Sequence, residues 1–196
     1  MDDLSGHWLS HFPDSYTSLV SLNISCLNNE VNLSALERLL GRCPDLQTLR
    51  LNHAAPLDKL PNLLSRCPQL VELGTGVYST EMRPEVFSNL VTAFSGCKQL
   101  KSVSGFWHVL PSYLPTVYPI CSRLTSLNLS YAIIQSCDLV KLVGQCPNLL
   151  RLWVCLIYIF SIYCLFHVFV CISGSLPLIL YILMLTKGHC YRCLIT

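Results

Sequence analysis

The amino-acid sequence predicts an α/β fold, a leucine-rich-repeat solenoid, and three observations carry that prediction. A phrase of the form Cys-(Pro)-x-Leu-x-x-Leu-x-Leu occupies Cys43–Leu51 and returns, with some variation, from Cys67, Cys97, Cys121 and Cys146. The spacings between these cysteines are 24, 30, 24 and 25 residues, a period typical of stacked structural repeats. Within each copy apolar residues alternate with other residues, which is the period of a strand with one buried face.

The segment before Cys43 predicts the helix of one repeat. Apolar residues fall at helical spacing over residues 33–40, with charged residues on the other face. Ser34 is the expected N-cap, because Glu37 three residues later would complete a capping box. Gly41 is the expected end of the helix, and Pro44 prevents its continuation. Each repeat is therefore a helix, a turn and a short strand.

Stacking these repeats would place parallel strands on a concave side and helices on a convex side, around one continuous core. A degenerate first copy over Tyr16–Ile24 brings the number of repeats to about six. The strands are expected near residues 22–24, 48–51, 71–74, 102–104, 126–129 and 151–154.

Composition divides the chain into a repeat segment, residues 1–154, and an apolar tail, residues 155–196. The first part carries 11 Lys/Arg and 11 Asp/Glu, a zero net charge that gives no nucleic-acid footprint. The tail has no acidic residue and only Lys187 and Arg192 as basic ones. As a helix, residues 152–172 would span about 30 Å, the thickness of a bilayer core.

The tail is thus expected to be an apolar helix, with membrane contact possible through residues 152–185. Two interpretations of it stay open. One is a transmembrane helix. The other, which the loss of the repeat period and the Cys, Ile, Phe, Leu and Tyr content favour, is translated intron read-through in a truncated gene model.

No catalytic constellation is present, so the sequence does not predict an enzyme, and no catalytic, cofactor-binding or metal residue is assigned. The repeat cysteines are interpreted as small core residues, because a metal site or a disulfide would require pairs within one layer. His189, Cys190 and Cys193 offer three zinc ligands, one short of a closed site. His7 and His11 have a metal-compatible i, i+4 spacing, although apolar neighbours favour an ordinary helix. The triplet of residues 74–76, Gly-Thr-Gly, is too short for a phosphate loop.

Several less generic stretches point to a family. They are SGHWLSHFPD at 5–14, NHAAPLDKLP at 52–61, SGFW at 104–107, CSRLTSLNLSYA at 121–132 and RLWV at 151–154. Together they strongly resemble the plant transport-inhibitor-response auxin receptors, the auxin-signalling F-box proteins, over about residues 2–154. The jasmonate receptor of the coronatine-insensitive type shares the architecture and matches less well.

The resemblance implies the substrate-recognition subunit of an SCF-type ubiquitin ligase in the nucleus, which recruits Aux/IAA transcriptional repressors in auxin signalling. Its partners would be those repressors, a Skp1-type adaptor and a cullin, and its cofactors auxin and inositol hexakisphosphate. In the family an F-box precedes these repeats and later repeats carry most of the hormone pocket. We therefore expect this chain to bind neither hormone nor adaptor.

No pocket residue of the family transfers to this segment, and Arg50, Arg123 and Arg151 are interpreted as solvated strand-face charges rather than phosphate ligands. The alternative function is a membrane-anchored leucine-rich-repeat receptor-like protein. Against it, the regular Asn and Gly-x-Ile-Pro pattern of plant extracellular repeats is missing.

Overall fold

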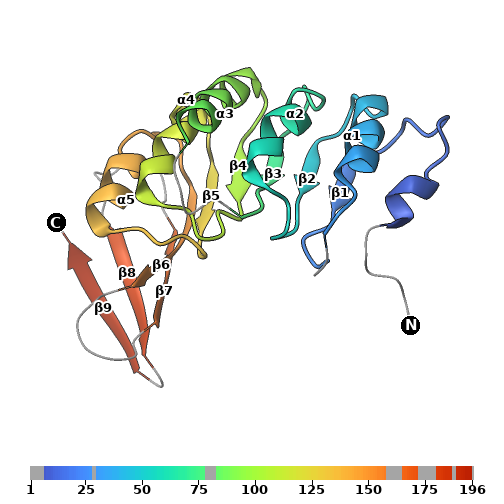
Figure 1. The fold of residues 1–196 in the computed structure, drawn as a ribbon. Coiled ribbons are helices and arrows are strands. Elements are labelled where there is room, and N and C mark those ends of the chain that lie inside the picture. The colour runs from blue at the N-terminus through green and yellow to red at the C-terminus, as the bar shows by residue number, and fades with distance from the viewer. Residues whose placement is uncertain are drawn as a thin grey trace.

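Six parallel strands lie side by side in one curved sheet, with helices covering one of its faces (Figure 1). This computed structural model describes residues 7–27, 30–77, 83–157, 165–171, 180–186 and 189–195. The parallel strands are β1 (Ser21–Asn23), β2 (Thr48–Arg50), β3 (Glu72–Gly74), β4 (Ser102–Ser104), β5 (Ser126–Leu129) and β6 (Arg151–Ile157). All six lie where the Leu-x-x-Leu-x-Leu period predicts a strand.

The register explains why the repeats share one core. The central residues of neighbouring strands pair in a row, and each has at most 6% of its surface exposed: Leu22, Leu49, Leu73, Val103, Leu127 and Leu152. The residues before and after them point to the other face of the sheet, since side chains alternate along a strand. One row of apolar side chains is therefore buried beneath the helices, and two rows lie on the concave face.

A turn that repeats five times joins each helix to its strand. The carbonyl of the repeat cysteine accepts a hydrogen bond from the N–H of the leucine three residues later, at 3.2 Å for Cys43 and Leu46. One carbonyl of each repeat then accepts two N–H groups from the next repeat, as Val20 does from Gln47 and Thr48 at 2.8 and 3.1 Å. These bonds satisfy backbone groups that strands of three or four residues would otherwise leave unpaired.

Three longer helices lie on the convex side: α1 (Leu33–Arg42), α3 (Pro84–Gly96) and α5 (Ser136–Val143). The predicted cap of α1 is wrong by two residues. Asn32 is the N-cap, and its Oδ1 accepts the Ala35 N–H at 3.0 Å. The helix also continues through Gly41, so the turn at Cys43, rather than the glycine, ends it.

The other convex segments are shorter than the expected helix because prolines interrupt them. In the third repeat, η2 (Leu57–Lys59) and α2 (Leu60–Leu64) follow Pro56 and include Pro61. In the fifth, η3 (Pro111–Val117) and α4 (Tyr118–Cys121) contain three prolines. Proline lacks the N–H that an α-helical bond needs, so 3₁₀ turns take the place of a regular helix. Upstream of β1, η1 (His7–His11) covers the first repeat.

The prediction that the repeat cysteines are core residues is confirmed. All five repeat cysteines are buried, and none forms a disulfide: Cys43, Cys67, Cys97, Cys121 and Cys146. Burial raises the pKa of the Cys67 thiol to about 12 and that of Cys97 to about 11. A hydrogen bond with the Cys146 thiol, together with burial, raises the pKa of Cys121. Protonated, buried thiols of this kind are inert space-filling groups.

The prediction of an apolar helical tail is wrong for the described residues. β6 runs on to Ile157 and pairs antiparallel with β7 (Leu165–Cys171), and β8 (Leu180–Thr186) pairs antiparallel with β9 (His189–Ile195). Ile, Val, Phe and Tyr favour strands, and the free edge of β6 offers unpaired backbone groups. Within the described part of the chain, no helix has the length and apolar character that crossing a bilayer requires. Residues 158–164 and 172–179 of the predicted spans lie outside the described residues.

Candidate functional site

The concave face of the sheet holds a hollow of about 500 Å³, which we call the concave hollow. It exists because short parallel strands in register expose the residues on either side of each buried central residue. Side chains from five neighbouring repeats therefore converge on it, although they are far apart in the sequence. The polar and aromatic residues that line it are Arg50, Glu72, Lys101, Ser102, Ser104, Thr125, Ser126, Asn128, Arg151 and Trp153.

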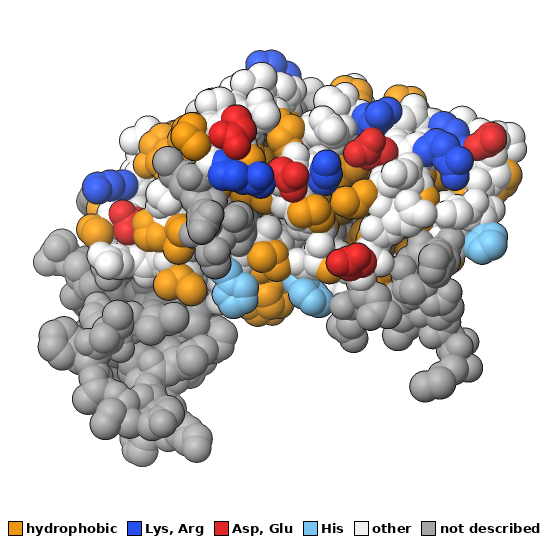
Figure 2. Space-filling view, in the orientation of Figure 1, with side chains coloured by type: hydrophobic (Ala, Val, Ile, Leu, Met, Phe, Trp, Pro, Cys, Tyr) orange, Lys and Arg blue, Asp and Glu red, His pale blue; other side chains and the backbone are white. Residues whose placement is uncertain are grey.

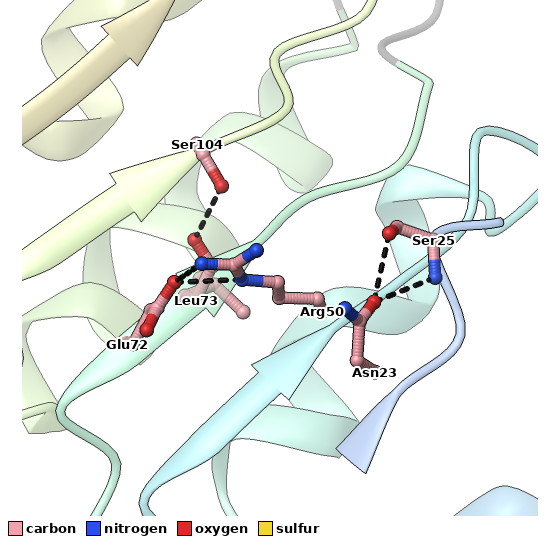
Figure 3. A network of polar contacts seen from close by, with 6 residues as sticks. All are labelled: Asn23, Ser25, Arg50, Glu72, Leu73 and Ser104. Carbon is pink, nitrogen blue, oxygen red and sulfur yellow. Dashed lines mark hydrogen bonds and ion pairs between the residues drawn. The ribbon is translucent and has the colours of Figure 1, made fainter. Parts of the chain in front are cut away.

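An ion pair closes one end of the concave hollow. The Arg50 guanidinium on β2 reaches over β3, and its Nε donates to Glu72 Oε1 at 2.7 Å (Figure 3). Gly74 makes room for this path, since a Cβ there would lie 3.1–3.3 Å from the Arg50 backbone and stem. The two side chains are 46% and 28% exposed, so water screens the pair and it contributes only about 0–1 kcal/mol. Its role is to fix where the two charges point.

Neighbouring polar groups extend this arrangement toward both flanks. Asn23 Oδ1 accepts the backbone N–H of Ser25 at 3.0 Å and its hydroxyl at 2.7 Å, which orders the turn after β1. Ser104 Oγ donates to the Leu73 carbonyl at 3.4 Å on the other flank (Figure 3). The Ser104 hydroxyl can still accept a hydrogen bond, because a hydroxyl both donates and accepts.

The other end of the concave hollow is cationic. Lys101 and Arg151 are exposed there, and within the described residues neither has an acidic side chain at ion-pair distance. Hydroxyl groups of Ser102 and Ser126 and the ring of Trp153 lie beside them. Two cations, hydroxyl donors and an indole form a surface that can take a peptide with a carboxylate or another anionic group.

The three arginines singled out from the sequence have different places. Arg50 and Arg151 lie in the concave hollow, Arg50 paired and Arg151 solvated, as expected of strand-face charges. Arg123 does not belong to this face: it sits in the turn before β5, where its Nη2 donates to the Cys97 carbonyl at 3.2 Å. Arg123 is a structural link between repeats.

The remaining sequence candidates form no site in the described part of the chain. No group of three or more His, Cys, Asp or Glu side chains that could hold a metal ion occurs there. His7 and His11 lie on a 3₁₀ helix, whose three residues per turn remove the i, i+4 alignment. His189, Cys190 and Cys193 fall on β9, where the structure describes the backbone alone. In the 74–76 triplet, Gly74 leaves space for Arg50, and a Cβ at Gly76 would lie 2.1 Å from the Ala55 carbonyl oxygen.

Sequence reasoning missed Glu72, Lys101 and Trp153 as members of this surface. The signal was available, since Glu72 directly precedes a predicted buried leucine and Trp153 directly follows one, and both positions face outward on a strand. Lys101 lies one residue before β4, outside the alternating positions of that strand, and still lines the concave hollow.

Sequence comparison relates this chain to plant proteins of greater length. GRR1-like protein 1 of Arabidopsis thaliana is 56% identical over 154 residues, which are 79% of this chain and 26% of that protein. Transport inhibitor response 1-like protein Os05g0150500 of Oryza sativa subsp. japonica is 54% identical over 154 residues, with the same shares of the two chains. F-box protein FBX14 of Arabidopsis thaliana is 39% identical over 148 residues, 74% of this chain and 24% of that protein.

The chain spans about a quarter of the length of the curated relatives it matches. No family model matches it.

Proposed function

Because its matched residues belong to the family of transport inhibitor response 1-like and GRR1-like F-box leucine-rich-repeat proteins, we propose that this chain is a segment of an auxin receptor. The whole protein would be the substrate-recognition subunit of an SCF-type ubiquitin ligase in the nucleus. There it would recruit Aux/IAA repressors for ubiquitination, with a Skp1-type adaptor and a cullin as partners. F-box proteins of this family are typically non-catalytic substrate adaptors of SCF ligases.

The observation that carries this proposal is the concave hollow. Its groups come from five repeats, and they offer charge, hydroxyl donors and an indole. A surface of this kind holds an extended partner by many weak contacts, as concave solenoid faces do. The hollow is therefore suited to holding part of a substrate protein while other subunits perform the chemistry.

The division of labour within the protein is part of the proposal. We propose residues 1–154 as the repeat segment and residues 155–196 as a separate segment. The resemblance assigns adaptor binding to an F-box and hormone binding mainly to later repeats. The 196-residue chain by itself is therefore expected to show no auxin-stimulated binding of a repressor degron. A pull-down in which auxin increases degron capture by this chain alone would contradict that expectation.

A chimera tests the function of the repeat segment. Residues 1–154 would replace the matched 154 residues of GRR1-like protein 1, and auxin-dependent capture of an Aux/IAA protein would be measured by pull-down. The chimera should retain capture, and Lys101→Glu with Arg151→Glu should weaken it. Lys141→Glu, on the exposed side of α5, is the matched control and should not. A folded chimera that captures no repressor with auxin present would overturn the proposal.

A further inference from the structure

The loop after β4 has an unusual backbone. Gly105, Phe106 and His108 all have positive φ, at 95°, 53° and 56°. Positive φ is disfavoured for residues with a side chain, so surrounding contacts must hold this conformation, and such strain tends to collect at functional sites. The Phe106 N–H donates to Thr75 Oγ1 at 2.7 Å, and the His108 N–H donates to the Tyr131 carbonyl at 3.1 Å.

The result of this conformation is a fixed tryptophan at the rim of the solenoid. The ring of Trp107 stacks on that of Tyr131, with centroids 3.7 Å apart and planes 12° from parallel. His53 approaches Trp107 at 6.2 Å between centroids, with its plane tilted by 56°. Tyr131 is 51% exposed, so the pair, which we call the aromatic ridge, stays partly open to solvent. Rigid aromatic side chains that are already ordered are the usual anchors of protein interfaces.

A hollow of about 440 Å³ lies next to the aromatic ridge, and we call it the rim hollow. His53 lines it, and so does Val77, whose backbone bridges to both Trp107 and Pro56. Apolar side chains of these loops and of α3 line the floor. Figure 2 shows histidine and hydrophobic side chains gathered along this lower rim, with an acidic side chain beside them.

The charges around the rim hollow are unbalanced toward the negative. Glu30, Asp58 and Arg83 line it, all three exposed. Within the described residues none of them forms an ion pair. Among the described residues that line the rim hollow there are thus two carboxylates and one guanidinium, beside apolar side chains and the His53 ring that approaches Trp107. This is the reverse of the concave hollow, whose open end is cationic.

We propose that the rim hollow and the aromatic ridge form a docking site for a basic, extended segment of a partner protein. The aliphatic stem of an Arg or Lys of that segment lies over Pro56 and Val77, where apolar surface is available to it. Its cationic head pairs with Glu30 and Asp58, and an adjacent side chain packs on the aromatic ridge. Charge complementarity selects this occupant, since an acidic segment would meet the two carboxylates and be repelled.

The test uses the full chain and a phage-displayed library of random twelve-residue peptides. Selected peptides would be synthesised with a fluorescein label, and their binding measured by anisotropy at two salt concentrations. Basic residues should be enriched among them, and binding should weaken with salt. Glu30→Gln with Asp58→Asn should weaken binding by about tenfold and remove most of the salt dependence, and Trp107→Ala should weaken it by about tenfold.

Matched controls separate this site from general charge and fold effects. Asp45→Asn removes an exposed carboxylate from the opposite end of a strand, and Tyr118→Ala removes an exposed aromatic ring from α4, so both should bind as the unchanged chain does. Circular dichroism confirms that each variant is folded, and the exposed Glu30 and Asp58 keep the test valid if Trp107→Ala does not fold.

Three results would overturn the proposal. The selected peptides could show no enrichment of basic residues, or the doubly neutralised variant could bind them as tightly as the unchanged chain does. The chain could also self-associate through Trp107 instead of binding a peptide there. The assay contains neither auxin nor adaptor, so its outcome is independent of the proposed receptor function.

Discussion

Two glycine-to-alanine changes in this chain should have opposite effects on stability. Gly105 has a φ of +95°, and a Cβ there would lie 2.2 Å from the Thr75 carbonyl oxygen and 2.7 Å from Thr75 N and Oγ1. Gly96 is the last residue of α3, and a Cβ there would meet nothing within 4 Å. The chemical change is identical at both positions, so the difference between the variants isolates the backbone conformation and the close approach at residue 105.

The magnitude for Gly105→Ala follows from two contributions. Left-handed backbone costs a residue with a side chain about 1–2 kcal/mol. Moving Thr75 away breaks its hydrogen bond with the Phe106 N–H, which contributes about 1 kcal/mol. Gly105→Ala should therefore lower the free energy of unfolding by about 2–3 kcal/mol. Gly96→Ala should raise it by up to about 1 kcal/mol, because alanine loses less backbone freedom on folding.

Thermal and urea unfolding, followed by circular dichroism on the full chain, measure the difference. In a domain of this size 1 kcal/mol shifts the Tm by about 2–4 °C, so the two variants should differ by roughly 10 °C. If both unfold at the same temperature and urea concentration as the unchanged chain, the loop after β4 does not have the positive-φ conformation, and the aromatic ridge loses its support.

Three further comparisons of variants probe other parts of the fold. Leu49→Ala should lower the free energy of unfolding by about 2–5 kcal/mol, because the side chain is fully buried; Leu150→Ala, at a side chain 51% exposed, should change it by less than about 0.5 kcal/mol, and equal urea midpoints would contradict the core assignment. Asn32→Ala should remove about 1 kcal/mol through loss of the cap bond, and Ser34→Ala almost nothing, so the reverse order in urea melts would make Ser34 the cap. Burial raises the pKa of the Cys67 thiol from 9.0 to about 12, so its stabilising contribution is complete below pH 9 and is lost as the pH rises toward 12. Tm should fall less steeply above pH 9 in Cys67→Ala than in the unchanged chain, and parallel Tm curves would exclude this linkage.

The strands were predictable because their signal is local and redundant. Each strand has a buried central residue with outward-facing neighbours, and the same turn precedes five of the six parallel strands. A copy of the repeat that departs from the pattern can therefore still be recognised from the others. The helices were harder. Asn32 and Ser34 are both good N-caps by residue type, and the structure decides between them, because the Ala35 N–H donates to Asn32 Oδ1 at 3.0 Å.

The candidate site was less accessible than the fold, because it depends on distances between repeats. Arg50 and Glu72 are 22 residues apart, and their pairing requires the in-register stacking of β2 on β3 together with the space left by Gly74. The alternation of the strands places Arg50 and Glu72 on outward positions. It does not show that the Arg50 side chain passes over Gly74 to reach Glu72, or that Arg123 donates to the Cys97 carbonyl. The stacking of Trp107 on Tyr131 likewise joins two loops 24 positions apart.

The tail shows why the length of an apolar run is a weaker signal than its amino-acid types. The length of residues 152–172 matches a bilayer core and on that ground predicts a helix. An apolar run without polar alternation does not distinguish a helix from buried strands, and β-branched and aromatic residues favour strands. The connection decides as well. A further parallel strand beside β6 would need a crossover of a dozen or more residues, whereas the chain offers residues 158–164 between β6 and β7, enough only for an antiparallel return. The parallel pairing of the repeats therefore ends at β6, the last strand that follows a helix and a turn.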